Sequence, residues 1–248
     1  MMRPLSIVSV LPELLGTNGD AANARVLAQR ARWAGVDAEI TPVRTAADLP
    51  EQIDLVVIGS GSDTELTAVR DILATMTERL RGWCTAGIPI LAIGTGWELL
   101  SWGIELGDGT VVEGLGIVTG RAVPLAERAT DDLILDSRFG RLVGFENHAR
   151  DYVGAEASAL GRVRSGTGNG PIPGGGTGVE GLVMGNLFGT HLHGPVLARN
   201  PVLADHLLRT ALARAGVEYV PGDRAVAVDE IAKAGRNQIA ARLGLTAE

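Results

Sequence analysis

The chain has 248 residues, is 46% hydrophobic, and carries a formal net charge of −7 with a pI of about 5.2. This length allows one sizeable α/β domain, and the acidic balance argues against a general nucleic-acid-binding surface. No apolar run reaches the ~18 residues of a membrane span, no signal-peptide core is present, and the single cysteine excludes an internal disulfide, so we expect a cytoplasmic protein.

The first part of the chain alternates apolar strands with amphipathic helices. Strands are expected at residues 5–11, 38–43, 54–58 and 88–93. Apolar residues recur at helical spacing over residues 24–34, where Asp20 is placed to cap the helix, and again over residues 66–80. This alternation predicts an α/β three-layer sandwich, with a mostly parallel central sheet and helices on both faces.

Three loops follow the carboxyl ends of these strands, at residues 12–20, 59–63 and 94–96. Ligands of parallel sheets bind beyond the carboxyl ends of the strands, so we expect the three loops to share one rim. The loop Gly59-Ser-Gly-Ser-Asp63 could direct backbone N–H groups at an anion or a developing oxyanion. An ordinary turn is the simpler interpretation, because short glycine patterns are weak signals.

The sequence changes character after about residue 107. Short β-prone segments predict antiparallel strands added to the sheet, and residues 166–178 are glycine-rich, as in an exposed loop. A further strand is expected at residues 182–192, followed by a helix from Asn200-Pro201 and a last helix over residues 226–243. We expect a single domain over residues 1–248, with residues 217–248 as a C-terminal helical extension.

Two polar motifs lie in this later part. Residues two apart on a strand share a face, so His191 and His193 could point the same way. A metal site would need further ligands, and no Asp, Glu or Cys cluster lies beside the pair. His193 is better placed to act as a single general base, and a structural histidine is an equally good interpretation. The run Phe145-Glu-Asn-His-Ala-Arg150 favours a solvated hairpin.

The turn Gly94-Thr95-Gly96 joins an apolar strand to a helix. This is the geometry in which many α/β enzymes present a nucleophile, but no strong nucleophile occupies the apex. Cys84 lies near the amino ends of the strands, opposite the expected rim. Free cysteines are usually packed and inert, so we do not expect Cys84 to supply the missing group.

Taken together, these segments resemble the class I glutamine amidotransferases of the cobyric-acid-synthase-like branch. Within it they are most similar to the glutaminase subunits of lipid II isoglutaminyl synthases. The resemblance spans roughly residues 5–210 and is carried by residues 15–23, 54–63, 89–93, 144–148 and 189–201. The motifs Gly-Phe-Glu-Asn-His and Leu-His-Gly-Pro…Arg-Asn-Pro are fairly specific to this branch.

The resemblance implies a subunit that hydrolyses glutamine and passes ammonia to a Mur-ligase-like, ATP-dependent partner in a heterodimer. The partner amidates the peptidoglycan stem peptide, and no cofactor is implied. In the family a cysteine thiolate attacks the amide, backbone N–H groups hold the oxyanion, and a histidine moves the protons. The histidine corresponds to His193, and the first oxyanion loop corresponds to Gly59, Ser60, Gly61 and Ser62.

The nucleophile is the departure from the family. The pattern Ile-Cys-Gly-Gly-Tyr-Gln-Leu reads Ile-Gly94-Thr95-Gly-Trp-Glu98-Leu here, and Gly-Gly-Gly-Gln-Asp reads Gly-Ser60-Gly-Ser62-Asp. Thr95 lies one residue off the apex, and an unactivated hydroxyl is a far poorer nucleophile than a thiolate. The carboxylate of Glu98 would disfavour a neighbouring thiolate or oxyanion. Several changes together indicate a natural loss of glutaminase chemistry.

Three hypotheses remain open from the sequence. The first is an amidotransferase-like subunit of a lipid II amidating complex, deficient in glutaminase activity because its nucleophile is absent. The second is a pseudo-amidotransferase that binds glutamine, a similar small ligand or a partner, and regulates without catalysis of its own. The third is an unrelated hydrolase or nucleotide-binding protein that uses residues 59–63 for phosphate.

Overall fold

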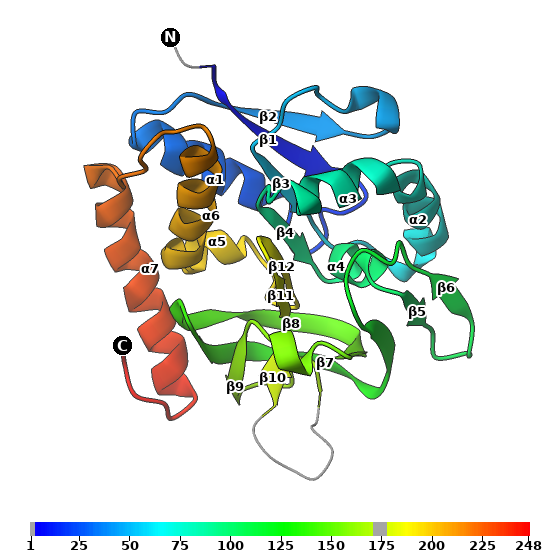
Figure 1. Ribbon diagram of the computed structural model, residues 1–248. Helices are drawn as coiled ribbons and strands as arrows, with labels where there is room; N and C mark the ends of the chain where they lie inside the picture. Colours follow the sequence, from blue (N-terminus) through cyan, green and yellow to red (C-terminus); the bar gives the residue numbers. More distant parts are fainter. Residues whose placement is uncertain (1–2, 171–177) are drawn as a thin grey trace.

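The computed structural model describes residues 3–170 and 178–248, and the first of its two sheets is mostly parallel. Its strand order is β11-β12-β4-β3-β1-β2, in which only β11 pairs antiparallel. The strands are β1 (Leu5–Val10), β2 (Ala38–Val43), β3 (Leu55–Ile58), β4 (Ile90–Ile93), β11 (Leu182–Met184) and β12 (Leu187–Thr190). Figure 1 shows this sheet in the upper part of the molecule.

Helices cover both faces of the parallel sheet. Successive side chains of a strand point to opposite faces, so an entirely apolar strand needs a covering layer on each side. Ile7 and Leu55 pack in the core under α1 (Ala22–Trp33), α5 (Val196–Arg199) and α6 (Pro201–Arg214). Val8 and Val56 pack in the core under α2 (Leu66–Ala74), α3 (Thr77–Thr85) and α4 (Thr95–Leu100). Burial on both faces explains the continuous apolar runs of these strands. The predicted three-layer α/β architecture is confirmed.

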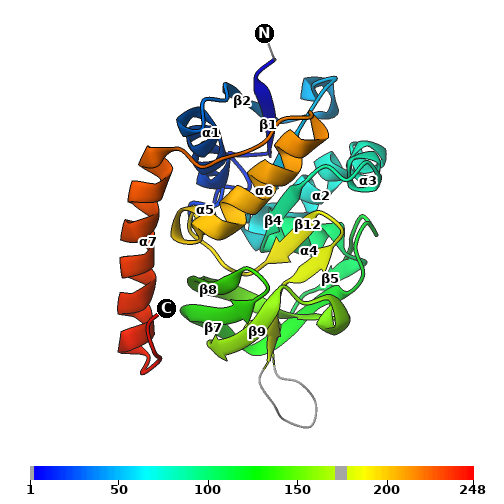
Figure 2. The ribbon, with the colours of Figure 1, turned by 60° about the vertical axis from the view of Figure 1, so that its left-hand side comes forward.

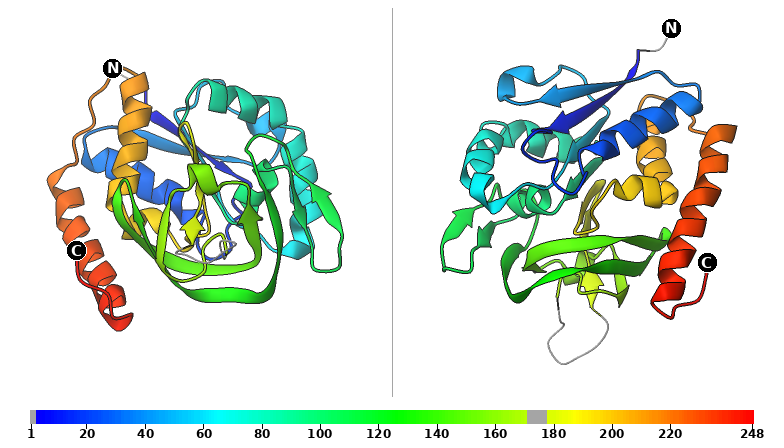
Figure 3. Two further views of the ribbon diagram at one scale, coloured as in Figure 1. Left: turned by 60° about the horizontal axis from the view of Figure 1, so that its bottom comes forward. Right: turned by 180° about the vertical axis from the view of Figure 1, so that it is seen from behind.

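The second sheet is built on a long antiparallel hairpin. Its strands are β5 (Gly103–Glu105), β6 (Val111–Glu113), β7 (Arg121–Ser137), β8 (Gly140–Val153), β9 (Gly161–Ser165) and β10 (Val179–Glu180). Figure 3 shows β7 and β8 curving together as one layer. The antiparallel strands expected after residue 107 are not added to the parallel sheet: β6–β10 belong to this separate sheet, together with β5, which pairs with β7 in parallel. The reason is that β7 and β8 satisfy most of their backbone hydrogen bonds with each other.

Two predicted elements are interrupted. The helix expected over residues 66–80 divides into α2 and α3, where the Thr75 hydroxyl donates to the carbonyl of Ile72 at 2.6 Å. Such side-chain bonds to the backbone compete with continuation of a helix. The strand expected at 182–192 turns back between β11 and β12, where Gly185 has a φ of 60°. The glycine-rich loop expected at residues 166–178 includes residues 171–177, which lie outside the described residues.

The last helix, α7 (Asp223–Arg242), runs along one side of both layers (Figure 2). Arg30 on α1 holds it through Asp229 at 2.6 Å, and Ala240 packs on Ile134 and Val143 of the second sheet. Within residues 3–170 and 178–248, no helix combines the length and apolar character needed to cross a membrane. Three short 3-10 helices complete the described elements: η1 (Ala46–Asp48), η2 (Asp63–Glu65) and η3 (Glu156–Ser158).

Candidate functional site

Gly94 forms a sharp bend between β4 and α4. Its φ of 50° and ψ of −124° lie in a region that residues with a Cβ rarely adopt. The bend is fixed by neighbouring strands, because the Gly94 N–H donates to Thr190 at 2.9 Å and the Gly96 N–H donates to Gly59 at 3.1 Å. The backbone therefore has the form of a nucleophile elbow, with only hydrogen at its apex.

The loops at residues 12–20, 59–63 and 94–96 meet at one rim of the sheet, as expected. Thr17 and Ser60 form an isolated antiparallel bridge, with the Thr17 N–H donating to the Ser60 carbonyl at 3.0 Å. A Cβ on Gly59 would lie 2.0 Å from the carbonyl oxygen of Leu15. Glycine is therefore required at position 59 for the first two loops to approach so closely.

His193 is oriented by a carboxylate from the first loop. Its Nδ1 lies 2.9 Å from Oδ2 of Asp20, whose Oδ1 accepts the N–H of Gly194 at 3.1 Å. Both side chains are buried, and Nε2 of His193 has no hydrogen-bond partner among the described residues. A proton on Nδ1, donated to Asp20, leaves Nε2 as a free acceptor. The pair has the arrangement of a general base and the group that orients it.

Asp20 was expected to cap α1, and that prediction is wrong. The N-cap residue of the helix is Ala21, and no side chain caps it. Asp20 instead turns toward a histidine 173 positions later in the chain. Two signals in the sequence could have identified it: its place on the shared rim and its presence in the segment 15–23 that carries the family resemblance.

The side-chain space at Gly94 is already occupied. A Cβ built there would lie 2.6 Å from Ser60 Oγ, 3.0 Å from Ser60 Cβ and 2.9 Å from His193 Cε1. The elbow and His193 therefore face one another, and Ser60 fills the space into which a side chain of residue 94 would project. The Thr95 N–H donates to Ser60 Oγ at 3.4 Å, and its hydroxyl donates to the Gly61 carbonyl at 3.1 Å.

A cavity of about 240 Å³ opens beside the elbow. It is lined by Thr17, Gly61, Ser62, Asp63, Thr95, Glu98, Arg128, Asn147, His148, Ala149 and Arg150. Most of these residues are polar or charged, which suits a small polar ligand. A more open groove of about 770 Å³, lined by residues of β7, β9 and η3, shares none of them.

The prediction of a solvated hairpin at residues 145–150 is wrong, because polar side chains of this segment are buried. Glu146, His148 and Arg150 project inward from β8 and are buried. Arg150 donates from Nε to Glu98 at 2.9 Å and from Nη1 to Asp63 at 2.8 Å. These partners come from distant parts of the chain, so local polarity could not reveal that the charges are compensated inside the protein.

Glu98 and His191 form a buried ion pair behind the cavity. The Nε2 of His191 lies 3.6 Å from Glu98, and its Nδ1 lies 3.4 Å from Glu180. Burial opposes both charges, yet Arg150 and His191 lower the pKa of Glu98 to about 2. Burial also opposes the charge on His191, but the carboxylates of Glu180 and Glu98 outweigh it and raise the pKa of His191 to about 9. His191 thus faces carboxylates, whereas His193 faces the elbow.

This pair makes stability depend on pH. A histidine whose pKa is higher in the folded than in the unfolded state stabilises the folded protein. For His191 this contribution is complete below the unfolded pKa of 6.5 and is lost as the pH passes the folded pKa of about 9. The unfolding free energy should therefore fall by up to about 3 kcal/mol between pH ~6.5 and ~10. Urea unfolding at several pH values measures this, and His191→Gln should flatten the slope. An unchanged slope in the variant would contradict the assignment.

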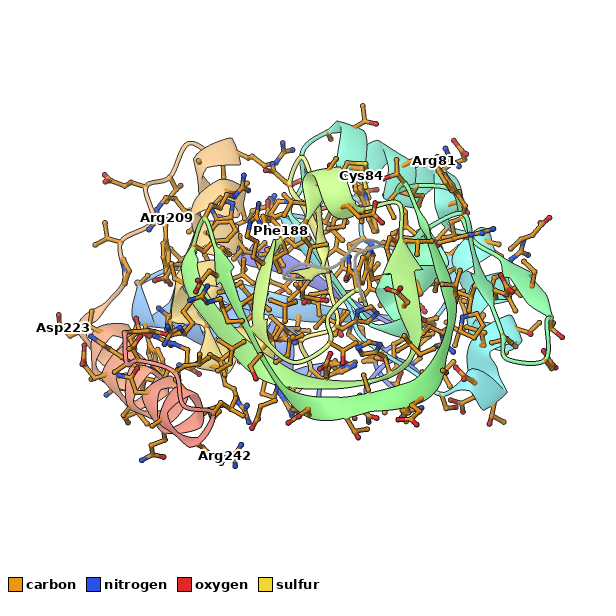
Figure 4. All side chains as sticks on the ribbon, turned by 90° about the horizontal axis from the view of Figure 1, so that it is seen from below. Arg81, Cys84, Phe188, Arg209, Asp223 and Arg242 are labelled. Carbon is orange, nitrogen blue, oxygen red and sulfur yellow. The ribbon has the colours of Figure 1, made fainter. Side chains whose placement is uncertain are left out.

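Two other expectations concern cysteine and metal ions. Cys84 lies on α3 near Arg81 (Figure 4), just before the amino end of β4, and burial raises the pKa of its thiol. It therefore stays outside the site described above. Within the part of the chain that the structure describes, no group of three His, Cys, Asp or Glu side chains is arranged to hold a metal ion.

Comparison with known proteins agrees with this geometry. Residues 7–201 match the model of the CobB/CobQ-like glutamine amidotransferase domain. The chain is 32% identical to the lipid II isoglutaminyl synthase (glutamine-hydrolyzing) subunit GatD of Staphylococcus aureus, over 89% of each chain. It is 31% identical to GatD of Streptococcus pneumoniae, over 85% of this chain and 81% of the relative.

The fold also matches solved structures. A crystal structure of a glutamine amidotransferase superposes with a TM-score of 0.56 at 20% identity, covering 85% of this chain and 99% of the other. At this identity the likeness shows the shared fold alone. The family match over residues 7–201 includes the elbow, the loop at 59–63 and His193. The chain therefore belongs to the CobB/CobQ-like glutamine amidotransferase family.

Proposed function

We propose that this chain is the amidotransferase-like subunit of a peptidoglycan-precursor amidating complex, and that it lacks glutaminase activity. The support for a subunit role is the 31–32% identity, over most of both chains, to relatives that carry the name of a synthase subunit. In this proposal the partner is a Mur-ligase-like, ATP-dependent protein, which uses free ammonia. Because the family is shown, the hypothesis of an unrelated nucleotide-binding protein is no longer needed.

The observation that carries the loss of activity is the absent side chain at Gly94, together with the filling of its space by Ser60. Glutamine hydrolysis in this family depends on a thiolate at that apex. His193 and Asp20 could still move a proton, but removing a nucleophile from such a unit typically lowers the rate by about 10⁶-fold. The Thr95 hydroxyl donates to the Gly61 carbonyl and lies one residue off the apex, so it does not replace the thiolate.

The direct test is ammonia release from glutamine by the purified chain. We expect none above the rate of glutamine in buffer, with a glutaminase of known activity as the positive control. In a reconstituted synthase, amidation should then proceed with ammonium chloride and fail with glutamine alone. Ammonia release by the unaltered chain at an ordinary enzymatic rate would overturn the proposed deficiency.

A second candidate is a pseudo-amidotransferase that binds a small ligand or a partner and regulates it without catalysis of its own. It is favoured by the cavity of about 240 Å³, which keeps charged side chains such as Asp63 and Arg128 although the apex is empty. Co-purification separates the candidates. A Mur-ligase-like protein that gains amide synthase activity on binding this chain supports the first, and binding without any amidation supports the second.

A further inference from the structure

Ser60 stands where the family pattern has glycine, and its hydroxyl lies beside the empty apex. Its Oγ is 2.6 Å from the point that a Cβ of Gly94 would occupy. The side chain is buried, with 6% of its surface exposed, and it contacts Thr95 at the edge of the cavity. A hydroxyl from a neighbouring loop has thus taken the space in which a side chain of residue 94 would project.

His193, the general base of the site, faces the same point. His193 Cε1 lies 2.9 Å from the position of that Cβ, so the serine hydroxyl and the edge of the imidazole flank one spot. Asp20 fixes the ring through Nδ1, which leaves Nε2 buried and without a partner among the described residues. A buried acceptor without a donor destabilises the fold and is tolerated mainly where it has a task. A proton donor such as Ser60 is what Nε2 lacks.

A backbone donor completes the set. The N–H of Thr95 is directed at Ser60 Oγ, at 3.4 Å. When an oxygen nucleophile attacks a carbonyl, the oxyanion forms next to the attacking atom. A fixed N–H at this position can therefore stabilise the charge that develops, as the donors of an oxyanion hole do.

We infer that Ser60, His193 and Asp20 form a serine acyl-transfer site, distinct from the lost cysteine chemistry. The Ser60 hydroxyl transfers its proton to Nε2 while Oγ bonds to the carbonyl carbon of an ester. The bond to the leaving group breaks, and His193 returns the proton to the leaving alcohol. Water then attacks the acyl-serine in the same way, which releases the acid and restores Ser60.

The step requires Ser60 to turn its hydroxyl from Thr95 toward Nε2. Catalytic hydrogen bonds are often long or misaligned in the free protein and tighten when substrate binds. The cavity that opens beside Gly61 and Thr95 measures about 240 Å³. This is below the range of roughly 300–1,000 Å³ for sites that take drug-sized ligands, so the substrate class is a small ester.

The test is labelling of the whole chain by a small fluorophosphonate. Ser60 Oγ would displace fluoride from phosphorus, and peptide mass spectrometry would locate the adduct. We expect the label on Ser60, its loss in Ser60→Gly, and a rate at least ~100-fold lower in His193→Gln, as for removal of a general base. The exposed Ser158→Ala serves as the matched control and should label as the unaltered chain does.

Three results would overturn the inference: no adduct on Ser60 in the unaltered chain, the same labelling rate in His193→Gln, or the same extent in Ser60→Gly. Circular dichroism of each variant separates a lost nucleophile from a lost fold. The glutamine assay tests the proposed deficiency separately from the labelling. Ammonia release that disappears in Ser60→Gly would support the serine site and refute the proposed deficiency, whereas an unlabelled, inactive chain would refute only the serine site.

Discussion

Replacing Gly94 by cysteine alone should not create glutaminase activity, whereas Gly94→Cys combined with Ser60→Gly should. A Cβ at position 94 meets Ser60 Oγ at 2.6 Å, which is closer than real Cβ contacts come, and Ser60 Cβ at 3.0 Å, which is tighter than most of them. The single variant must therefore push Ser60 away or rotate the new thiol out of the site. Glycine at position 60 removes both atoms and restores the residue that the family pattern has there. Only the 2.9 Å approach to His193 Cε1 then remains to be relieved by a shift of the ring.

The expected gain in the double variant is about 100-fold or more over either single variant. This is a small part of the ~10⁶-fold that a nucleophile in a complete catalytic unit contributes, because Glu98 and Ser62 also differ from the family pattern. The positive φ of Gly94 adds a cost of about 1–3 kcal/mol for any residue with a Cβ, which the surrounding fold must absorb. Ammonia release from glutamine is the measurement.

Two controls sharpen this experiment. Adding His193→Gln to the double variant should abolish the new activity, because the thiol then loses its base. Ser60→Gly alone should release no ammonia. Equal activity in Gly94→Cys and the double variant would show that Ser60 does not block the apex, and the steric argument would then be wrong.

Replacing Arg150 by methionine should destabilise the protein by about 3–5 kcal/mol. The guanidinium is buried and donates to Glu98, whose pKa of about 2 keeps the carboxylate ionised near neutral pH. Removing one partner of a buried ion pair leaves the other charge unpaired in a medium that solvates it poorly. His191 can compensate only in part, since its Nε2 lies 3.6 Å from the carboxylate.

Urea unfolding of a small variant set measures this effect. Arg128→Met removes an exposed arginine of the same cavity and should change the unfolding free energy by less than about 0.5 kcal/mol, as surface substitutions usually do. Arg150→Met combined with Glu98→Gln removes the stranded charge and should recover most of the lost stability. Equal destabilisation of the single and double variants would mean that Arg150 acts through packing rather than through its charge.

Local patterns determined the parallel sheet and the loops that carry the site. Strands with continuous apolar residues and helices with one apolar face have to be buried in layers, and this constraint follows from spacing alone. The boundaries of β2 at Ala38 and Val43 agree with the prediction, as does the proline at the first position of α6. The absence of a nucleophile at Gly94 was also visible, because the residues around it match a family motif.

What the sequence by itself determined, then, is the architecture, the shared rim and the empty apex. Only the tertiary structure decided that Asp20 orients His193, that Ser60 fills the space at Gly94, and that the polar residues of β8 are buried. Each of these depends on partners far apart in the chain, 173 positions for Asp20 and His193 and 52 for Glu98 and Arg150. Periodicity reports which face of an element is apolar, but the energy of a buried charge depends on what lies opposite it, and that is fixed only when the chain has folded.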